Sequence, residues 1–469
     1  MAGCRTESSC HLRERYVIYI LLIYILQLCQ TEHVICNLKL KKNMRNLCFY
    51  FQIHLPFRLK RYRFFDIGND HYYFDDFQIG DEIRHFVEQS YLPANKAILE
   101  MIRSSNGKFK CSFAISGITL EQFELYAPEA IDSFKELAAT GNVEFLAEPY
   151  AHSLASVFDA NEFERQVKLH SNKIQALFGK KPSTFYNSEL IYSDEIGELV
   201  SKMGYKIMLI DEAKHIMGWK SPNFIYSHSY LPKLKLAVRN YKLSDDIAFH
   251  FVDFSLTAEK FIGWISAFPQ DEQIVNIGMG YEVFGITQSA YTGIFDFLKA
   301  LPYHAMEQQI GFVLPAELSK KYESAGSLSV PYPMSWVGND KDLTPWTGND
   351  LQQEALNKLY AVGERVRLCK DKQLLLDWLI LQSTDHFRYM SHKDAYRSYY
   401  DSAYEAFMNY MNVLADFLSR VEAQYPSTIE NEELNELLKT INRQEEEIEA
   451  LELVIEKLKS KTKKRVVKK

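Results

Sequence analysis

Polar side chains, most of them acidic or histidine, stand at the ends of several predicted strands of this 469-residue chain. Any one of them would more often be an ion-pair or helix-capping residue. Their recurrence at successive strand ends favours a shared site, because the carboxyl ends of parallel strands meet at one end of a barrel. Such a set predicts a cleft for a polar, hydroxyl-rich ligand. In chain order the residues are His54, Glu144, Glu148, His152, Glu189, Asp211, Glu212, Tyr281 and Glu282.

Glu189 is the strongest candidate for a reactive group. It lies in the segment 184–194, Thr-Phe-Tyr-Asn-Ser-Glu-Leu-Ile-Tyr-Ser-Asp, which follows Pro182 and ends on polar residues. A short apolar and aromatic run of this kind predicts a buried strand. The end of such a strand is where barrel enzymes place their chemistry. We therefore interpret Glu189 as a catalytic carboxylate.

Other kinds of site find little support in the sequence. The metal-binding patterns His-Glu-x-x-His and Cys-x-x-Cys are absent, so no metal site is expected. Phosphate-loop and dinucleotide glycine patterns are absent too, so no nucleotide cofactor is expected. The formal charge of −7 gives no reason to expect nucleic-acid binding. The seven cysteines are scattered, which fits a reducing compartment and predicts a cytoplasmic protein.

Regular alternation of strands and helices must position these residues. Helix-like segments such as 128–139, 161–178 and 194–203 separate the apolar runs. Strands that alternate with helices pair in parallel, and about seven of them predict an α/β fold with a distorted (β/α)7 barrel over residues 44–300. The predicted strands are 47–53, 109–115, 143–147, 184–187, 206–210, 236–238 and 274–279.

Beyond the barrel the apolar residues take helical spacing. Segments 350–370, 373–382 and 404–423 predict a helical bundle over residues 301–425 that packs on the barrel. Residues 426–469 carry a heptad pattern and end in a basic tail. They predict either a coiled coil, with a homo-oligomer formed through residues 430–458, or a single amphipathic helix on the protein's own surface.

Residues 1–43 differ from the rest of the chain. The apolar run 17–28 is long enough for the core of a signal peptide but shorter than the roughly 20 residues that a spanning helix needs. No small-residue cleavage site follows it. We therefore favour translation that begins at Met44, although Met1 stays an alternative, and membrane contact is expected only if the 17–28 segment is part of the protein.

Five ordered motifs resemble those of the family 57 glycoside hydrolases. His-Leu-Pro-Phe-Arg-Leu at 54–59 is similar to the first family signature, His-Gln-Pro-x-Arg-Leu, and Gly-Asn-Val-Glu at 141–144 is similar to the second. Asn-Ser-Glu-Leu-Ile-Tyr at 187–192 resembles the third, which carries the nucleophile. The fourth and fifth correspond to 279–288 and 335–349, so the resemblance covers about residues 44–419.

The resemblance implies a seven-stranded barrel with a helical bundle that acts on α-linked glucans or maltooligosaccharides with retention of configuration. It implies neither a metal nor an organic cofactor, and by motif position it makes Glu189 the nucleophile. Together with the strand-end pattern, it predicts that the sugar is bound by His54, Glu144, His152, Tyr281, Trp336, Asp385 and His386.

The fourth motif departs from the family pattern. The α-amylase-like branch usually reads Met-Asp-Tyr-Glu-Thr-Phe-Gly-Glu-His there, with the Asp as general acid/base, whereas this chain has Gly280. A retaining glycosidase needs a proton donor about 5 to 5.5 Å from its nucleophile. Glu282 is not expected to substitute, because two residues along an extended strand shift a side chain by roughly 6.5 to 7 Å.

The sequence therefore predicts an α-amylase-like, α-glucan-active protein with impaired catalysis that keeps a carbohydrate-binding groove. The first alternative is an active retaining α-amylase or 4-α-glucanotransferase whose acid comes from elsewhere in the chain. The second is a non-enzymatic scaffold that works through the C-terminal coiled coil.

Overall fold

The computed structural model describes residues 45–369, 371–392 and 398–425, together with a few isolated positions between 437 and 451. The extension predicted at 1–43 lies outside these residues. The helix predicted at 426–469 also lies outside them, apart from the isolated positions, so the coiled coil and association through 430–458 stay predictions. In the described ranges, no helix combines the length and the hydrophobicity that are needed to cross a bilayer.

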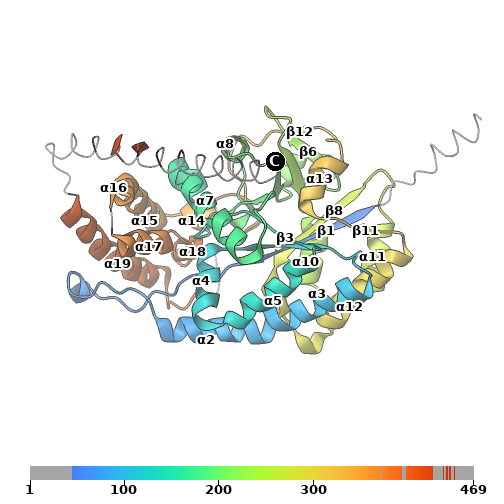
Figure 1. Cartoon of the computed structure of the whole chain (residues 1–469), viewed down its shortest axis with the longest axis horizontal. Helices are drawn as coiled ribbons and strands as arrows, with labels where there is room; N and C mark the ends of the chain where they lie inside the picture. The colour runs from blue at the N-terminus through green and yellow to red at the C-terminus, as the bar shows by residue number, and fades with distance from the viewer. Residues whose placement is uncertain are drawn as a thin grey trace, which may run out of the picture.

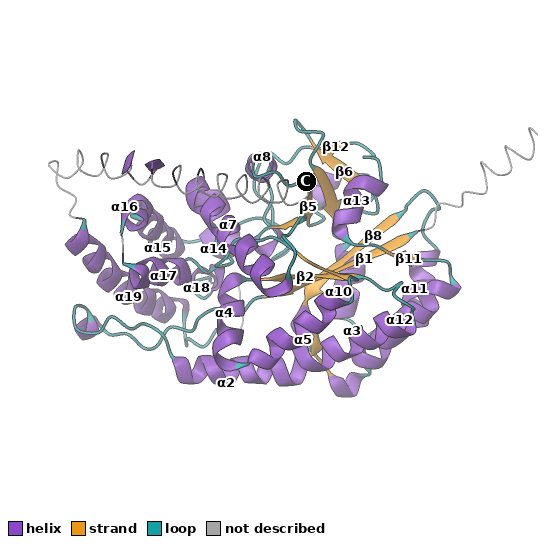
Figure 2. Cartoon of the chain, viewed as in Figure 1, coloured by secondary structure: helices purple, strands orange, loops and turns teal. Residues whose placement is uncertain are grey.

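All seven predicted strands are present and lie side by side in two sheets. Strands are drawn in orange in Figure 2. In the first sheet, β1 (Asn46–Ile53) lies between β2 (Cys111–Ile115) and β8 (Ile274–Gly280), and β3 (Val143–Phe145) pairs with the far side of β2. These pairs are all parallel. The second sheet holds, in spatial order, the parallel strands β4 (Phe185–Tyr186), β5 (Ile207–Ile210) and β7 (Lys235–Val238).

Two parallel bridges close these sheets into a ring. Ala147 pairs with Phe185 and so links the end of β3 to β4, while Arg239 pairs with Asn276 and links the end of β7 to β8. The order around the ring is therefore β1-β2-β3-β4-β5-β7-β8, which confirms the distorted seven-stranded parallel barrel. In this ring β4 and β8 lie on opposite sides.

Several short strands were not predicted. β6 (Ile225–His228) pairs antiparallel with β7, β12 (Ser327–Leu328) extends that sheet, and β11 (Gly311–Phe312) pairs with the start of β1. The predicted domain boundary at residue 300 falls inside α12 (Ile294–Glu307), and two of these strands follow it. The part of the chain that contributes to the barrel sheets therefore continues to Leu328.

Helices cover the outside of the barrel (Figure 1). The three predicted examples are α5 (Pro128–Ala139), α7 (Ala160–Phe178) and α8 (Asp194–Lys202). Local capping sets their ends: the Asp159 side chain accepts hydrogen bonds at the start of α7, and Gly179 ends that helix in a left-handed conformation. Others on the barrel are α3 (Leu92–Ser104), α4 (Gly117–Tyr126), α10 (Tyr241–Ala248) and α11 (Ala258–Ser266).

A tyrosine fills part of the barrel interior. Tyr50 of β1 is fully buried and lies opposite Gly278 in the β1–β8 register. A Cβ atom on Gly278 would lie 2.1 Å from Cζ of Tyr50, so the ring rests directly against the β8 backbone. Tyr186 of β4 meets the same ring edge-on, with 6.2 Å between ring centres.

A helical region packs on one end of the barrel, at the left of Figure 1. It places a short helix, α18 (Thr384–Arg388), next to the strand ends, where Ser383 forms an antiparallel bridge with Ser153. α18 was not predicted, whereas the longer helices correspond to the predicted segments. These are α15 (Asp350–Ala361), α16 (Gly363–Leu368), α17 (Lys372–Leu381) and α19 (Ala403–Gln424).

Candidate active site

A cleft of ≈ 820 Å³ opens at the carboxyl ends of the barrel strands. Gln52 and Gly280, which are register partners at the ends of β1 and β8, form part of its floor. Trp336 and Lys341 enter from the loop after β12. The volume is in the range of small-molecule sites, roughly 300 to 1,000 Å³. The ionisable residues of the wall are His54, Glu189, Glu212, Lys214, His215, Arg239, Tyr241, Asp245, Glu282, Lys341 and Arg388.

Glu189 lies in this cleft directly after β4, in a left-handed backbone conformation with φ of 52°. Non-glycine residues rarely adopt this conformation, and strained positions of this kind cluster at functional sites, where the surrounding structure offsets the strain. Here the support comes from Trp336. Its indole N–H donates to Oε2 of Glu189 at 2.5 Å, and its backbone N–H donates to the Glu189 carbonyl oxygen at 3.2 Å. Both contacts fix the direction of the carboxylate.

His152 supports the other oxygen of the carboxylate. It is fully buried, and its Nε2 lies 3.5 Å from Oε1 of Glu189, while its Nδ1 lies 2.9 Å from Oε2 of Glu148. Burial alone would lower the pKa of His152, but the two carboxylates raise it to about 10, so the imidazole is a cation at neutral pH. Burial would likewise raise the pKa of Glu189, but His152 and then Arg388 and Trp336 lower it.

The raised pKa of His152 predicts a pH-dependent stability. The unfolded side chain titrates near pH 6.5 and the folded one near 10, so the stabilisation that the proton on His152 provides is fully present below about pH 6.5 and is lost as pH rises toward about 10. Over this window the free energy of unfolding should fall by up to about 1.4 kcal/mol per pH unit more in the wild type than in His152→Gln. Urea unfolding of both proteins at pH 6 to 9.5 measures this, and equal slopes would contradict it.

His54 and Asp385 form a second pair beside the first. Nε2 of His54 lies 2.8 Å from Oδ2 of Asp385, and its Nδ1 lies 2.8 Å from the Ser116 hydroxyl. Its ring stacks on His152, with centres 4.2 Å apart. Burial and then the neighbouring imidazole lower the pKa of His54, whereas the pKa of Asp385 is lowered despite burial, chiefly by His54. The structure therefore brings His54, His152, Glu189, Gly280, Trp336 and Asp385 together.

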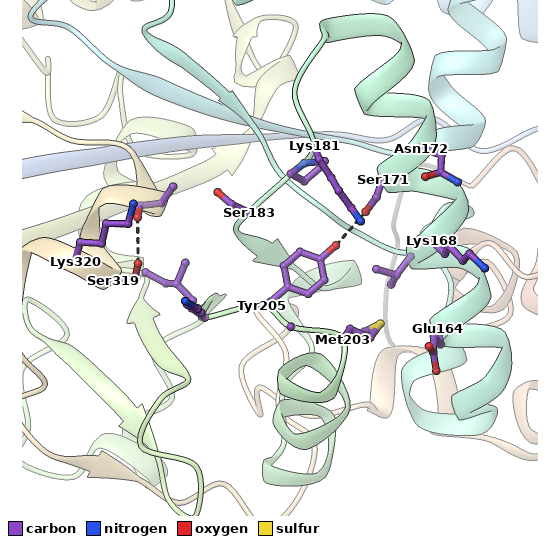
Figure 3. A pocket seen from close by; sticks show the side chains of 16 residues that line it. Glu164, Lys168, Ser171, Asn172, Lys181, Ser183, Met203, Tyr205, Ser319 and Lys320 are labelled. Carbon is purple, nitrogen blue, oxygen red and sulfur yellow. Dashed lines mark hydrogen bonds between the residues drawn. The ribbon is translucent and has the colours of Figure 1, made fainter. Parts of the chain in front are cut away.

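Glu144 is not at this site, contrary to the prediction. It lies in the middle of β3, not at its carboxyl end, and its carboxylate accepts hydrogen bonds from the Thr184 hydroxyl at 2.7 Å and the Ala316 backbone N–H at 3.0 Å. The Ser183 hydroxyl also donates to the Glu144 carboxylate, at 3.2 Å. Ser183 lines a separate pocket of ≈ 530 Å³ at the amino ends of β4 and β5 (Figure 3). Glu144 thus caps the first turn of α13 (Pro315–Lys321) at the opposite end of the barrel.

Tyr281 and His386 also point away from the cleft. Tyr281 is fully buried, stacks on Tyr91 and donates to Oδ1 of Asn95 at 2.7 Å. His386 packs against Tyr410 in the helical region, and burial lowers its pKa to about 4. Tyr281 follows Gly280, which lines the cleft, and His386 follows Asp385, which pairs with the cleft residue His54. The prediction included both because of these neighbours in the motif.

Several cleft residues were given no specific role from the sequence, and Arg239 and Glu212 are two of them. Arg239 follows β7, its guanidinium lies 5.2 Å from the centre of the Trp336 ring, and it pairs with Asp211 at 3.2 Å and Asp245 at 2.5 Å. Its position directly after a predicted strand could have indicated from the sequence that Arg239 lies at the site. Glu212 was noted at its strand end only; burial, then Asp211, raises its pKa to about 7.

The turn after β8 differs from the extended strand that we had assumed. Residues 281–283 form one turn of 3-10 helix, so the chain folds back on itself after Gly280. A Cβ atom on Gly280 would lie 2.4 Å from Oε2 and 2.6 Å from Oε1 of Glu282. The carboxylate of Glu282 therefore occupies the space that a side chain at position 280 would need, and the expected separation of 6.5 to 7 Å was wrong.

No group of three or more His, Cys, Asp or Glu side chains in the described part of the chain could hold a metal ion.

Comparison with known proteins agrees with the motifs. The sequence profile of Glycosyl hydrolase family 57 matches residues 48–331. A Methanocaldococcus jannaschii protein provisionally named an alpha-amylase is 32% identical over 397 residues, which are 79% of this chain and 84% of that protein.

Solved structures share the fold at low sequence identity. The branching enzyme of Thermococcus kodakaraensis aligns with a TM-score of 0.63 and 13% identity over 84% of this chain and 94% of that one. The 4-alpha-glucanotransferase of Thermococcus litoralis aligns with a TM-score of 0.60 and 14% identity over 79% of this chain. This chain spans 59% of the length of that glucanotransferase. These structural likenesses establish the fold alone.

Proposed function

Since this chain belongs to glycosyl hydrolase family 57, we propose that it processes α-linked glucans such as maltooligosaccharides with retention of configuration. Glu189 is the nucleophile that attacks the anomeric carbon. The cleft binds the sugar between its aromatic rings, Trp336, Tyr241 and the exposed Phe249, and its charged groups.

The observation that carries this proposal is the environment of Glu189. A nucleophilic carboxylate must be ionised, accessible to the cleft and fixed in direction. Glu189 lines the cleft, its pKa is lowered, and a hydrogen bond from Trp336 holds one oxygen while the His152 cation lies near the other. The left-handed backbone of Glu189 agrees with this role, because strained positions cluster at functional sites.

A glycosyl fluoride tests the nucleophile separately from the acid, because fluoride departs without being protonated. We expect α-maltosyl fluoride to be consumed with retention of configuration, as observed by NMR of the first products. A 5-fluoro-α-glucosyl fluoride should trap a covalent adduct on Glu189, identified by mass spectrometry of the digested protein. Absence of any adduct, or an adduct on another residue, would overturn the assignment.

Glycine at position 280 favours a second candidate function, which is glucan binding without turnover. In that case maltoheptaose should bind saturably in calorimetry and remain uncut on prolonged incubation, because the motif position of the proton donor carries no side chain. Retained cleavage of maltoheptaose would exclude this candidate. The two functions therefore separate on an unactivated substrate.

A further inference from the structure

We propose that Glu282 is the general acid/base of this site, delivering its carboxyl group to the place that residue 280 serves in related sequences. This inference rests on the proposed function, since an acid is needed only if Glu189 acts as a nucleophile. It assigns to Glu282 a role that its position in the motif does not suggest.

The first argument is where the Glu282 carboxylate lies. Both of its oxygens fall within 2.4 to 2.6 Å of the Cβ position of residue 280, and its Cδ lies 2.7 Å away. An aspartate at 280 would hold its own carboxyl group one bond beyond that Cβ. The 3-10 turn over 281–283 thus brings a longer side chain from two residues further on back to the same part of the cleft.

The second argument is the position of this carboxylate relative to Glu189. The two residues follow β8 and β4, which lie on opposite sides of the barrel, and both line the same cleft. Gly280 is the register partner of Gln52, whose amide lies 2.9 Å from Nε2 of His152, the ring that also faces Glu189. A sugar held over Gln52 and His152 would have one carboxylate on each side.

The reaction then balances with these two groups. Protonated Glu282 gives its proton to the glycosidic oxygen as that C–O bond breaks, while an oxygen of Glu189 forms a bond to the anomeric carbon. In the second step ionised Glu282 takes a proton from water or from an acceptor sugar hydroxyl. The oxygen of that acceptor bonds to the anomeric carbon, the bond to Glu189 breaks, and both carboxyl groups return to their starting states.

Two other carboxylates of the cleft fit this role less well. Asp245 is held in an ion pair with Arg239 at 2.5 Å, so its carboxylate is already engaged by a neighbouring cation. Glu212 follows β5, the strand next to β4, whereas Glu282 follows β8 on the opposite side of the barrel. Its raised pKa still makes it the rival to be tested.

The test compares how the rates of Glu282→Gln and of the wild type depend on the leaving group of the substrate. We expect kcat/KM on maltoheptaose to fall by roughly 10² to 10⁴, the usual contribution of a general acid. Across aryl α-maltosides the loss should shrink as the phenol becomes more acidic, and the first chemical step on α-maltosyl fluoride should change by less than about tenfold. Azide should restore turnover of the variant and yield α-maltosyl azide, because azide attacks the glycosyl-enzyme without a base.

Glu259→Gln, an exposed carboxylate at the start of α11, serves as the control and should change none of these rates. Equal losses of Glu282→Gln on all substrates would indicate a structural role and overturn the proposal. The proposal would also be overturned if Glu282→Gln showed the same rates as the wild type on every substrate, or if the leaving-group-dependent loss were found in Glu212→Gln instead. If the proposed function itself fails, the wild type will not be labelled at Glu189, whereas failure of this inference alone leaves that labelling intact.

Discussion

Replacing Glu189 by glutamine is expected to abolish the covalent adduct and to lower kcat/KM on both α-maltosyl fluoride and maltoheptaose by at least about 10⁴-fold. Loss of the nucleophile in covalent enzymes costs on the order of 10⁶-fold, and here no leaving group can compensate, because the bond to the anomeric carbon cannot form. The amide has the shape of the carboxylate and can still accept a hydrogen bond from Trp336. Stopped-flow fluoride release and intact mass measure the two effects.

A second substitution separates lost chemistry from lost structure. Glu189→Gly suits the backbone, because glycine adopts a φ of 52° without strain. It also leaves room for a small anion in the cleft. With azide and α-maltosyl fluoride this variant should form β-maltosyl azide, the inverted product, by direct attack on the face that Glu189 occupied. Retained activity in Glu189→Gln, or α-maltosyl azide from Glu189→Gly, would contradict the assignment.

Gly278→Ala should destabilise the barrel by about 3 kcal/mol or more, the upper end of overpacking effects. The added methyl would lie between 2.1 and 2.5 Å from three atoms of the Tyr50 side chain, and β8 cannot retreat because it is hydrogen-bonded along β1. The midpoint of urea unfolding should fall with an unchanged slope. Tyr50→Leu in the same chain should recover part of the loss, since the two positions share one space.

Gly263→Ala provides the matched control for that experiment. Gly263 lies within α11, and no atom lies within 4 Å of the Cβ position. Alanine there should stabilise the protein by about 0.4 to 1 kcal/mol, because it restricts the unfolded chain. A neutral result for Gly278→Ala beside this control would mean that the Tyr50 ring can move without cost.

The strands could be predicted because they are buried. Each of the seven is a short apolar run between helical segments, and the β1 residues from Asn46 to Ile53 are all buried. β6, with the sequence Ile-Tyr-Ser-His, carried no such pattern, and its antiparallel pairing depends on β7. β11 and β12 have only two residues each and form because a partner strand is already in place.

Site residues could be predicted where a motif lies at the end of a strand. They could not be predicted where the side chain points away from the cleft. His54 and Glu189 follow β1 and β4 and reach the cleft, as expected. The prediction for Glu144 was wrong because successive side chains of a strand point to opposite faces, and residue 144 lies within β3. The prediction for Tyr281 was wrong for a related reason, since a turn directs its ring to the aromatic core while its neighbours Gly280 and Glu282 line the cleft.

The 3-10 turn after β8 has a consequence for how such sequences evolve. Because it folds the chain back within three residues, a side chain at position 280 and the side chain at position 282 would reach the same point in the cleft. A proton donor could pass from one position to the other through intermediates in which both carboxylates compete for that point, without the barrel changing shape. Loss of a motif residue in a relative with this turn is therefore better judged by which carboxylate reaches that point than by the letter in one alignment column.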